Sequence, residues 1–231
     1  MAINPTTLTR GAALSAIAGG ALFIGVQIGH PHMDVESITT TEVIVRNTLK
    51  LVMVALVLCG ITGMFLSQVR RNGVLGLIGY VLFALGYLLI MGTTFASAYV
   101  LPAIADTDPA FVADVIAAGT GGSPAGDLGW LAVAFQVQGA AYLGGGLLLG
   151  IALFRAGVLA RWAAALLALS GVVSAALVVM PDAFYRLLAW PNGIAMIGLG
   201  YSLWATTRAV STATSAAGAV GDAPVAIAGA E

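Results

Sequence analysis

Charged side chains are scarce in this chain. Asp, Glu, Lys and Arg together make up 8% of its 231 residues and hydrophobic residues make up 60%, whereas about 25% of the residues in a soluble domain are charged. This composition is typical of an integral membrane protein, because each membrane-spanning helix needs roughly 20 mostly apolar residues. The length leaves no room for a separate soluble domain beside about six such helices.

Cysteine and clustered basic residues are also scarce. The single cysteine, Cys59, lies in an apolar run, which excludes an internal disulfide and a CxxC redox pair. The net charge is -1 and basic residues form no run, so the chain lacks the footprint of a nucleic-acid-binding protein. The hydrocarbon region of the predicted spans holds no acid, base or histidine, which argues against an ion-coupled transporter, a membrane protease and a membrane hydrolase.

Uncharged runs predict an all-α fold, an integral membrane bundle of six transmembrane helices. The approximate limits of these spans are 11–29, 48–68, 74–99, 128–153, 162–180 and 187–207. The first run is longer than the apolar core of a signal peptide and no small-residue cleavage site follows it, so we expect a retained helix. Residues 1–208 form the transmembrane domain, and the low-complexity residues 209–231 predict a disordered cytoplasmic tail.

Basic residues predict the orientation, because Lys and Arg in short loops stay in the cytoplasm. Arg46, Lys50 and Arg186 fall on one side of the predicted membrane, and six arginines fall on the other: Arg10, Arg70, Arg71, Arg155, Arg161 and Arg208. Both termini are therefore expected in the cytoplasm. The outer face is acidic, because it receives Asp34, Glu36, Glu42, Asp106, Asp108, Asp114, Asp127 and Asp182.

Two outer segments carry local structure. The sequence TTTE, residues 39–42, predicts a capping box in which Thr39 bonds the N–H of Glu42 and starts the second helix outside the membrane. Glu42, Arg46 and Lys50 then share one face, which favours a solvated helix extension. Residues 106–119 predict a short helix with an aspartate cap and an apolar side. It lies in the membrane interface or folds over the bundle as a lid, and the composition favours the interface.

Repeated spacings indicate an origin in three tandem helical hairpins. RGAALSAIAGG at 10–20 is similar to RWAAALLALSG at 161–171, so the first and fifth helices resemble each other. The even helices end alike, with a glycine ten residues before an arginine: Gly60 and Arg70, Gly145 and Arg155, Gly198 and Arg208.

A family resemblance follows from FRAGVLARWAAALLALSG at 154–171 and from a first helix that ends at His30 and Pro31. With these motifs the chain resembles a set of uncharacterised small multi-pass membrane proteins of high-GC bacteria, over most of residues 10–208. The resemblance implies a six-helix fold in the bacterial plasma membrane and no particular activity.

The sequence GHPHMDVE, residues 29–36, holds the candidate metal ligands His30, His32 and Asp34. Imidazole and carboxylate groups suit zinc or copper, so this cluster could serve a metal-dependent or redox membrane enzyme. In the alternative, these are interfacial polar residues that close the first helix, which Pro31 ends. The pattern alone favours the alternative.

Neutral polar residues collect in the outer half of the predicted spans: Gln27, Thr94, Ser97, Gln136, Gln138 and Asn192. They could line an outward-opening pocket with Tyr99 and Trp190 at its rim, or they could bond across helices. Glycines in the runs 76–79 and 144–150 favour close helix packing and therefore the second interpretation.

The sequence therefore predicts a membrane protein without an evident catalytic site, more in keeping with a non-enzyme. Its expected partners are the lipid bilayer and, through its outer half, a lipid or apolar small molecule, a membrane protein or a second copy of the chain. The metal-dependent enzyme and a weakly binding uncoupled transporter are the alternative hypotheses.

Overall fold

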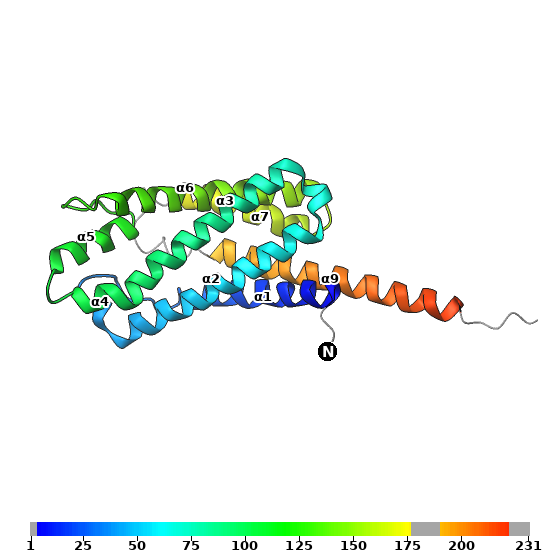
Figure 1. Cartoon of the computed structure of the whole chain (residues 1–231), viewed down its shortest axis with the longest axis horizontal. Helices are drawn as coiled ribbons and strands as arrows, with labels where there is room; N and C mark the ends of the chain where they lie inside the picture. Colours follow the sequence, from blue (N-terminus) through cyan, green and yellow to red (C-terminus); the bar gives the residue numbers. More distant parts are fainter. Residues whose placement is uncertain (1–3, 177–189, 222–231) are drawn as a thin grey trace, which may run out of the picture.

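The computed structural model describes residues 4–176 and 190–221 as helices joined by turns and loops (Figure 1). The longer helices are α1 (Pro5–Gly25), α2 (Thr41–Ser67), α3 (Val69–Phe95), α6 (Trp130–Ala156), α7 (Arg161–Ala176) and α9 (Trp190–Gly221). Shorter elements are η1 (Ser37–Thr39), η2 (Ala96–Val100), α4 (Leu101–Ile104) and α5 (Pro109–Gly119). These two ranges contain no β-strand, which confirms the all-helical prediction.

Within residues 4–176 and 190–221, four helical segments are long and apolar enough to cross a membrane: α1, α2, the continuous segment Val69–Ile104, and α6. Membrane insertion is therefore supported by the structure as well as by composition. Helix α7 begins at Arg161 and α9 at Trp190, close to the starts of the fifth and sixth predicted runs. The ends of those two runs at 177–180 and 187–189 lie outside the described residues.

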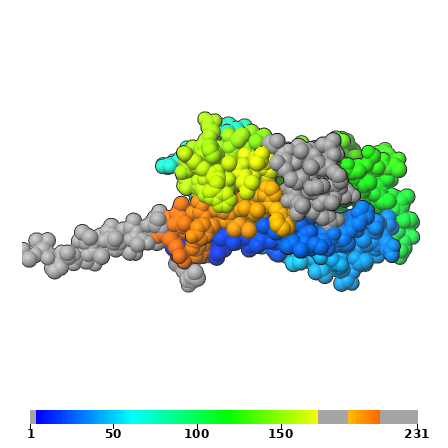
Figure 2. Space-filling view, turned by 180° about the vertical axis from the view of Figure 1, so that it is seen from behind, coloured from blue at the N-terminus to red at the C-terminus, as the bar shows by residue number. Residues whose placement is uncertain are grey.

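Six of the described helices close into a ring. Along the ring α1 packs on α2, α2 on α3, α3 on α6, α6 on α7, α7 on α9, and α9 back on α1. Figure 2 shows α9 lying along α1, with α7 on the same face. Each of these six helices runs antiparallel to the helix that precedes it in the ring (Figure 1).

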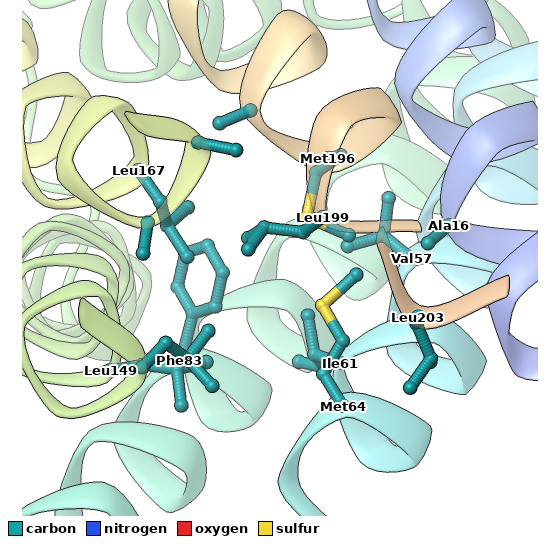
Figure 3. Close-up of a cluster of buried hydrophobic side chains, with 14 of the residues drawn as sticks. Ala16, Val57, Ile61, Met64, Phe83, Leu149, Leu167, Met196, Leu199 and Leu203 are labelled. Atoms are coloured by element: carbon teal, nitrogen blue, oxygen red, sulfur yellow. The ribbon is translucent and has the colours of Figure 1, made fainter. Parts of the chain in front are cut away.

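Apolar side chains from all six helices fill the centre of the ring (Figure 3). Each helix of the ring contributes at least one side chain that is at most 1% exposed. In ring order, examples are Ala16, Val57, Phe83, Leu149, Leu167 and Leu199. Such a cluster is a packed core, so the ring is held together from within.

Glycines allow the helices to approach closely. A Cβ on Gly60 would lie 2.7 Å from the Cβ of Ala16 on α1. A Cβ on Gly145 would overlap with the α3 main chain at Phe83, and one on Gly198 would overlap with a side chain of α7. The three glycines that precede an arginine by ten residues therefore each contact the preceding helix of the ring. This confirms the predicted role of small residues in close helix packing.

The bundle has two chemically different ends. The basic end holds the α2–α3 and α6–α7 turns with Arg10, Arg70, Arg71, Arg155, Arg161 and Arg208. Gly73 lies at a kink near the start of α3 with φ of 58°, a left-handed conformation that favours glycine. The acidic end holds Asp34, Glu36, Glu42, Asp106, Asp108, Asp114 and Asp127.

A second apolar cluster covers the acidic end, and we call it the cap. It is formed by Ile38, Val43, Leu101, Ala105, Val112, Val115, Ile116 and Leu128. Helix α5 begins as predicted, since the Asp108 Oδ1 accepts the Phe111 N–H at 3.1 Å, and it ends at Gly119. The apolar side of α5 is buried in the cap, as the lid alternative expects. Its position relative to the membrane interface stays a prediction.

The start of α2 also differs from the prediction. Thr40, not Thr39, is the N-cap residue, and its Oγ1 accepts the Val43 N–H at 3.4 Å. Thr39 instead donates its hydroxyl to the Glu36 carbonyl at 2.8 Å, because residues 37–39 form the turn η1. Helix α2 nevertheless begins well before residue 48, as the sequence predicted.

Helix α9 continues to Gly221, whereas low complexity predicted a disordered tail from residue 209. Alanine is abundant in this segment and has the highest helix propensity, so the helix can propagate beyond Arg208. Residues 222–231 lie outside the described residues.

Candidate functional site

The ring of His30 is held between the main chain and a lysine. Its Nδ1 lies 2.9 Å from the Pro31 carbonyl oxygen, which can only accept, so Nδ1 carries the hydrogen. The bare Nε2 then accepts a hydrogen bond from Lys50 Nζ at 2.9 Å. Lys50 also donates to the Asn47 Oδ1 at 3.1 Å. The lone pair that a metal would need is therefore engaged, and an ammonium group stands beside it.

The two other candidate ligands lie in an exposed turn. The carboxylate of Asp34 accepts the Ser37 N–H at 2.7 Å, and this backbone hydrogen bond is the main reason that the pKa of Asp34 is lowered. Asp34 therefore remains ionised, and its side chain closes the turn that leads into η1. His32 is exposed beside it and contributes a smaller electrostatic lowering of the Asp34 pKa. Within the described ranges, no three His, Cys, Asp or Glu side chains lie close enough together to hold a metal ion.

A zinc measurement tests this assignment. We expect that replacing His30 and His32 together by alanine leaves the metal content of the protein unchanged, because His30 is engaged by Lys50 and Pro31. Elemental mass spectrometry of protein purified without a metal-binding tag measures this content. Loss of one metal equivalent in the double variant would contradict it.

Arg46 has a structural role that was not predicted from the sequence. Its guanidinium donates to the carbonyls of Ile28 at 2.9 Å, Gly29 at 3.1 Å and Val26 at 3.4 Å. It also forms an ion pair with Glu42 at 2.9 Å. These carbonyls follow the last turn of α1 and have no partner within that helix. The face of α2 that carries Glu42 and Arg46 was predicted to be a solvated extension. In the structure its Arg46 binds the end of α1 to α2.

The neutral polar residues of the acidic half fall into three groups. Gln138 lies between α3 and α6, where its Oε1 accepts the Thr93 hydroxyl at 2.9 Å, so it bonds across helices. Gln136 is exposed, and Gln27, Thr94 and Ser97 are half-buried. These four make no side-chain hydrogen bond to another described residue. The remaining residue, Asn192, is buried.

Ser97 belongs to a widened turn at the end of α3. Residues 96–100 are π-helical, and Pro102 follows. Proline lacks an N–H and would clash with the carbonyl of Ala98 in a regular helix, so the wider turn relieves the conflict. The Tyr99 hydroxyl in this turn lies 2.9 Å from the Thr48 Oγ1 of α2.

Asn192 joins three helices at the core of the bundle. Its side chain comes from the first turn of α9 and is 2% exposed. The amide nitrogen donates to the Tyr87 hydroxyl of α3 at 3.0 Å and to the Tyr142 hydroxyl of α6. The rings of Tyr87 and Tyr142 meet edge to face, with centroids 5.4 Å apart. We call Asn192, Tyr87 and Tyr142 the amide cluster.

One polar atom of the amide cluster lacks a partner. The Asn192 Oδ1 is buried and accepts no hydrogen bond from any residue that the structure describes. Rotating the amide by 180° exchanges its two ends and leaves the Nδ2 group unpaired instead. On α2 the buried Asn47 has a similar feature, because its Nδ2 has no partner. Unpaired amides in an apolar core are costly, so they mark a place where a polar group of a ligand could bind.

The two tyrosines were missed by sequence reasoning. Tyr87 and Tyr142 lie in the middle of apolar runs, whereas tyrosine in a membrane helix is usually found near the interface. That position was an available signal. Their convergence on Asn192 was not, because it depends on how α3, α6 and α9 pack.

Searches of the chain against protein-family models, curated proteins and solved structures found no match.

Proposed function

We propose that this chain is a multi-pass protein of the bacterial plasma membrane that crosses the bilayer six times, through α1, α2, α3, α6, α7 and α9. The closed ring of these helices and the apolar length of four of them support the proposal. The arginines of the basic end favour the cytoplasmic side for both termini. The glycine contacts of α2, α6 and α9 favour three tandem hairpins, and the motifs at 154–171 favour the high-GC bacterial set.

Within this fold the amide cluster binds a lipid or a small apolar molecule that carries a hydrogen-bond donor. The observation that carries this proposal is the buried Asn192 Oδ1 without a partner, between two tyrosines from different helices. A hydroxyl or amine of the ligand supplies the missing hydrogen bond, and the aromatic rings pack on its apolar part. The half-buried Gln27, Thr94 and Ser97 lie in the same half of the bundle.

A membrane protein or a second copy of the chain is the other class of occupant for the acidic half. The exposed Gln136 beside the bonded Gln138 is the feature that such a partner would use. Neither class requires a catalytic residue, and the engaged His30 gives the metal-dependent enzyme no support.

Asn192→Leu tests the proposed site, because leucine has a similar volume and no polar group. We expect native mass spectrometry of gently extracted wild-type protein to show a bound small molecule, with occupancy about tenfold lower in the variant. Tyr142→Phe should lower occupancy less, because Asn192 keeps its bond to Tyr87.

Ser202→Ala is the matched control on the same helix. Ser202 bonds the Ala160 N–H at 2.9 Å and lies away from the amide cluster, so bound mass should be unchanged. Equal occupancy in wild type and Asn192→Leu, with both proteins folded by size-exclusion chromatography and circular dichroism, would exclude the site. A folded wild-type protein that shows no bound small molecule would also exclude the site.

A further inference from the structure

A hollow of about 480 Å³ lies at the basic end, opposite to the amide cluster. It is lined by residues 66–71 of the α2–α3 turn and by Val158 of the α6–α7 turn. Leu66 and Val69 at its margin are 62% and 46% exposed. Exposed apolar side chains beside a polar hollow are expected where a protein surface passes from lipid hydrocarbon to headgroups.

Two arginines supply positive charge to this hollow. Arg70 and Arg71 both line it and are exposed, and neither forms an ion pair with another described residue. Guanidinium groups bind phosphate through short charge-assisted hydrogen bonds, so an anionic phosphate matches this side of the hollow.

A buried amide supplies a second chemical requirement. Gln68 also lines the hollow and is 5% exposed, and its Nε2 donates to the Met64 carbonyl at 3.4 Å. Its Oε1 is buried without a partner, and the same is true of the Oδ1 of Asn72, one turn away. Both unpaired atoms are acceptors. A phosphate cannot satisfy them, because it is itself an acceptor, so the ligand needs a donor group next to its phosphate.

Aromatic side chains lie in the contact between α2 and α3 next to the hollow. Phe65 of α2 stacks on Tyr80 of α3, with ring centroids 4.7 Å apart. The Tyr80 hydroxyl lies 3.0 Å from the Thr62 Oγ1. Aromatic side chains thus form the contact between α2 and α3, where glycines form contacts between other helix pairs.

We propose that the hollow binds a phospholipid whose headgroup combines a phosphate with a primary ammonium, such as phosphatidylethanolamine. Arg70 and Arg71 bind the phosphate, and Gln68 Oε1 accepts a hydrogen bond from the ammonium. Leu66, Val69 and Val158 contact the beginning of the acyl chains. The site requires that the chain lies in a bilayer, and it is independent of what binds the amide cluster.

Lipid titration tests the headgroup. Delipidated full-length protein in detergent is mixed with phosphatidylethanolamine, phosphatidylcholine or phosphatidylglycerol of identical acyl chains, and native mass spectrometry measures the bound fraction. Phosphatidylcholine keeps the phosphate and the positive charge but has no N–H donor, whereas phosphatidylglycerol has hydroxyl donors in place of the ammonium. We expect phosphatidylethanolamine to bind about tenfold more tightly than phosphatidylcholine. Equal binding of these two, or tighter binding of phosphatidylglycerol, would overturn the proposal.

Variants separate the two halves of the headgroup. Gln68→Leu should abolish the preference for phosphatidylethanolamine over phosphatidylcholine, because it removes the acceptor that, of these two lipids, only the ammonium of phosphatidylethanolamine can use. Arg70→Gln with Arg71→Gln changes only exposed residues, so it should fold normally and weaken all three lipids. Arg155→Gln is the control, because Arg155 is an exposed arginine of the same end outside the hollow. A preference that survives both Gln68→Leu and the double arginine variant would also overturn the proposal.

Two further arms identify the ligand source and the site. Soluble phosphoethanolamine at millimolar concentration should displace little lipid, because it lacks acyl chains; complete displacement would assign the hollow to a free headgroup and overturn the lipid. Asn192→Leu should leave the phosphatidylethanolamine preference intact. Failure of the amide cluster and failure of this hollow are therefore distinguishable.

Discussion

Gly145→Ala is expected to destabilise the bundle by about 3 kcal/mol, near the upper end of the usual cost of overpacking. The added methyl group would overlap with the α3 main chain at Phe83, and main-chain atoms cannot move aside as the tip of a side chain can. The helix pair α3 and α6 would have to separate, which would also disturb the amide cluster. Thermal unfolding in detergent, followed by circular dichroism, measures the loss.

The adjacent residue provides a matched control. A Cβ on Gly144 would meet no atom within 4 Å, so Gly144→Ala adds a methyl group to the lipid-facing side of the same helix. Alanine has a higher helix propensity than glycine by about 1 kcal/mol, and we expect stability to stay equal or rise slightly. Equal destabilisation by the two substitutions would show that close approach at Gly145 is not what holds α3 to α6.

Arg46→Gln is expected to cost about 2–3 kcal/mol and to release the segment that follows α1, because hydrogen bonds from a charged donor contribute about 1.5–3 kcal/mol. The substitution removes the guanidinium that satisfies the carbonyls of Val26, Ile28 and Gly29. Hydrogen exchange monitored by mass spectrometry should show faster exchange in residues 26–40 than in the core of α2.

Glu42→Gln controls for the ion pair. The Glu42 side chain is 57% exposed, so its pairing with Arg46 should contribute no more than about 0.5 kcal/mol. Exchange in residues 26–40 should therefore stay close to that of wild type. If the two variants behaved alike, the carbonyl contacts of Arg46 would have no role in fastening α1.

Features encoded by neighbouring residues could be predicted from the sequence. Apolar runs placed the long helices, and Asp108, Pro109 and Gly119 placed the limits of α5. The cap of α2 was wrong by one residue, because Thr39 and Thr40 offer the same hydroxyl and only the turn η1 decides between them. Low complexity misled at residues 209–221, where alanine favours a helix.

Site chemistry could be predicted from the sequence as a class of interaction, but not as pairs of residues in contact. Gln138 was placed correctly among the residues that bond across helices, and its partner is 45 positions away. The class of interaction followed from composition, whereas the partner did not. The amide cluster joins residues up to 105 positions apart. His30, His32 and Asp34 misled in the opposite direction: they are neighbours in sequence, but the His30 ring turns to Lys50, 20 positions away.

The closure of the ring by α1 and α9 has a consequence for biogenesis. Gly20 of α1 and Gly193 of α9 lie against each other, although 173 positions of the 231-residue chain separate them. Helices leave the ribosome in sequence order, so α1 is synthesised long before α9. The face of α1 that contacts α9 therefore stays uncovered until the last helix has been made. A nascent chain that stops before α9 would present that face to the membrane's quality-control proteases. Completion of synthesis and protection from degradation are thereby coupled through one helix pair.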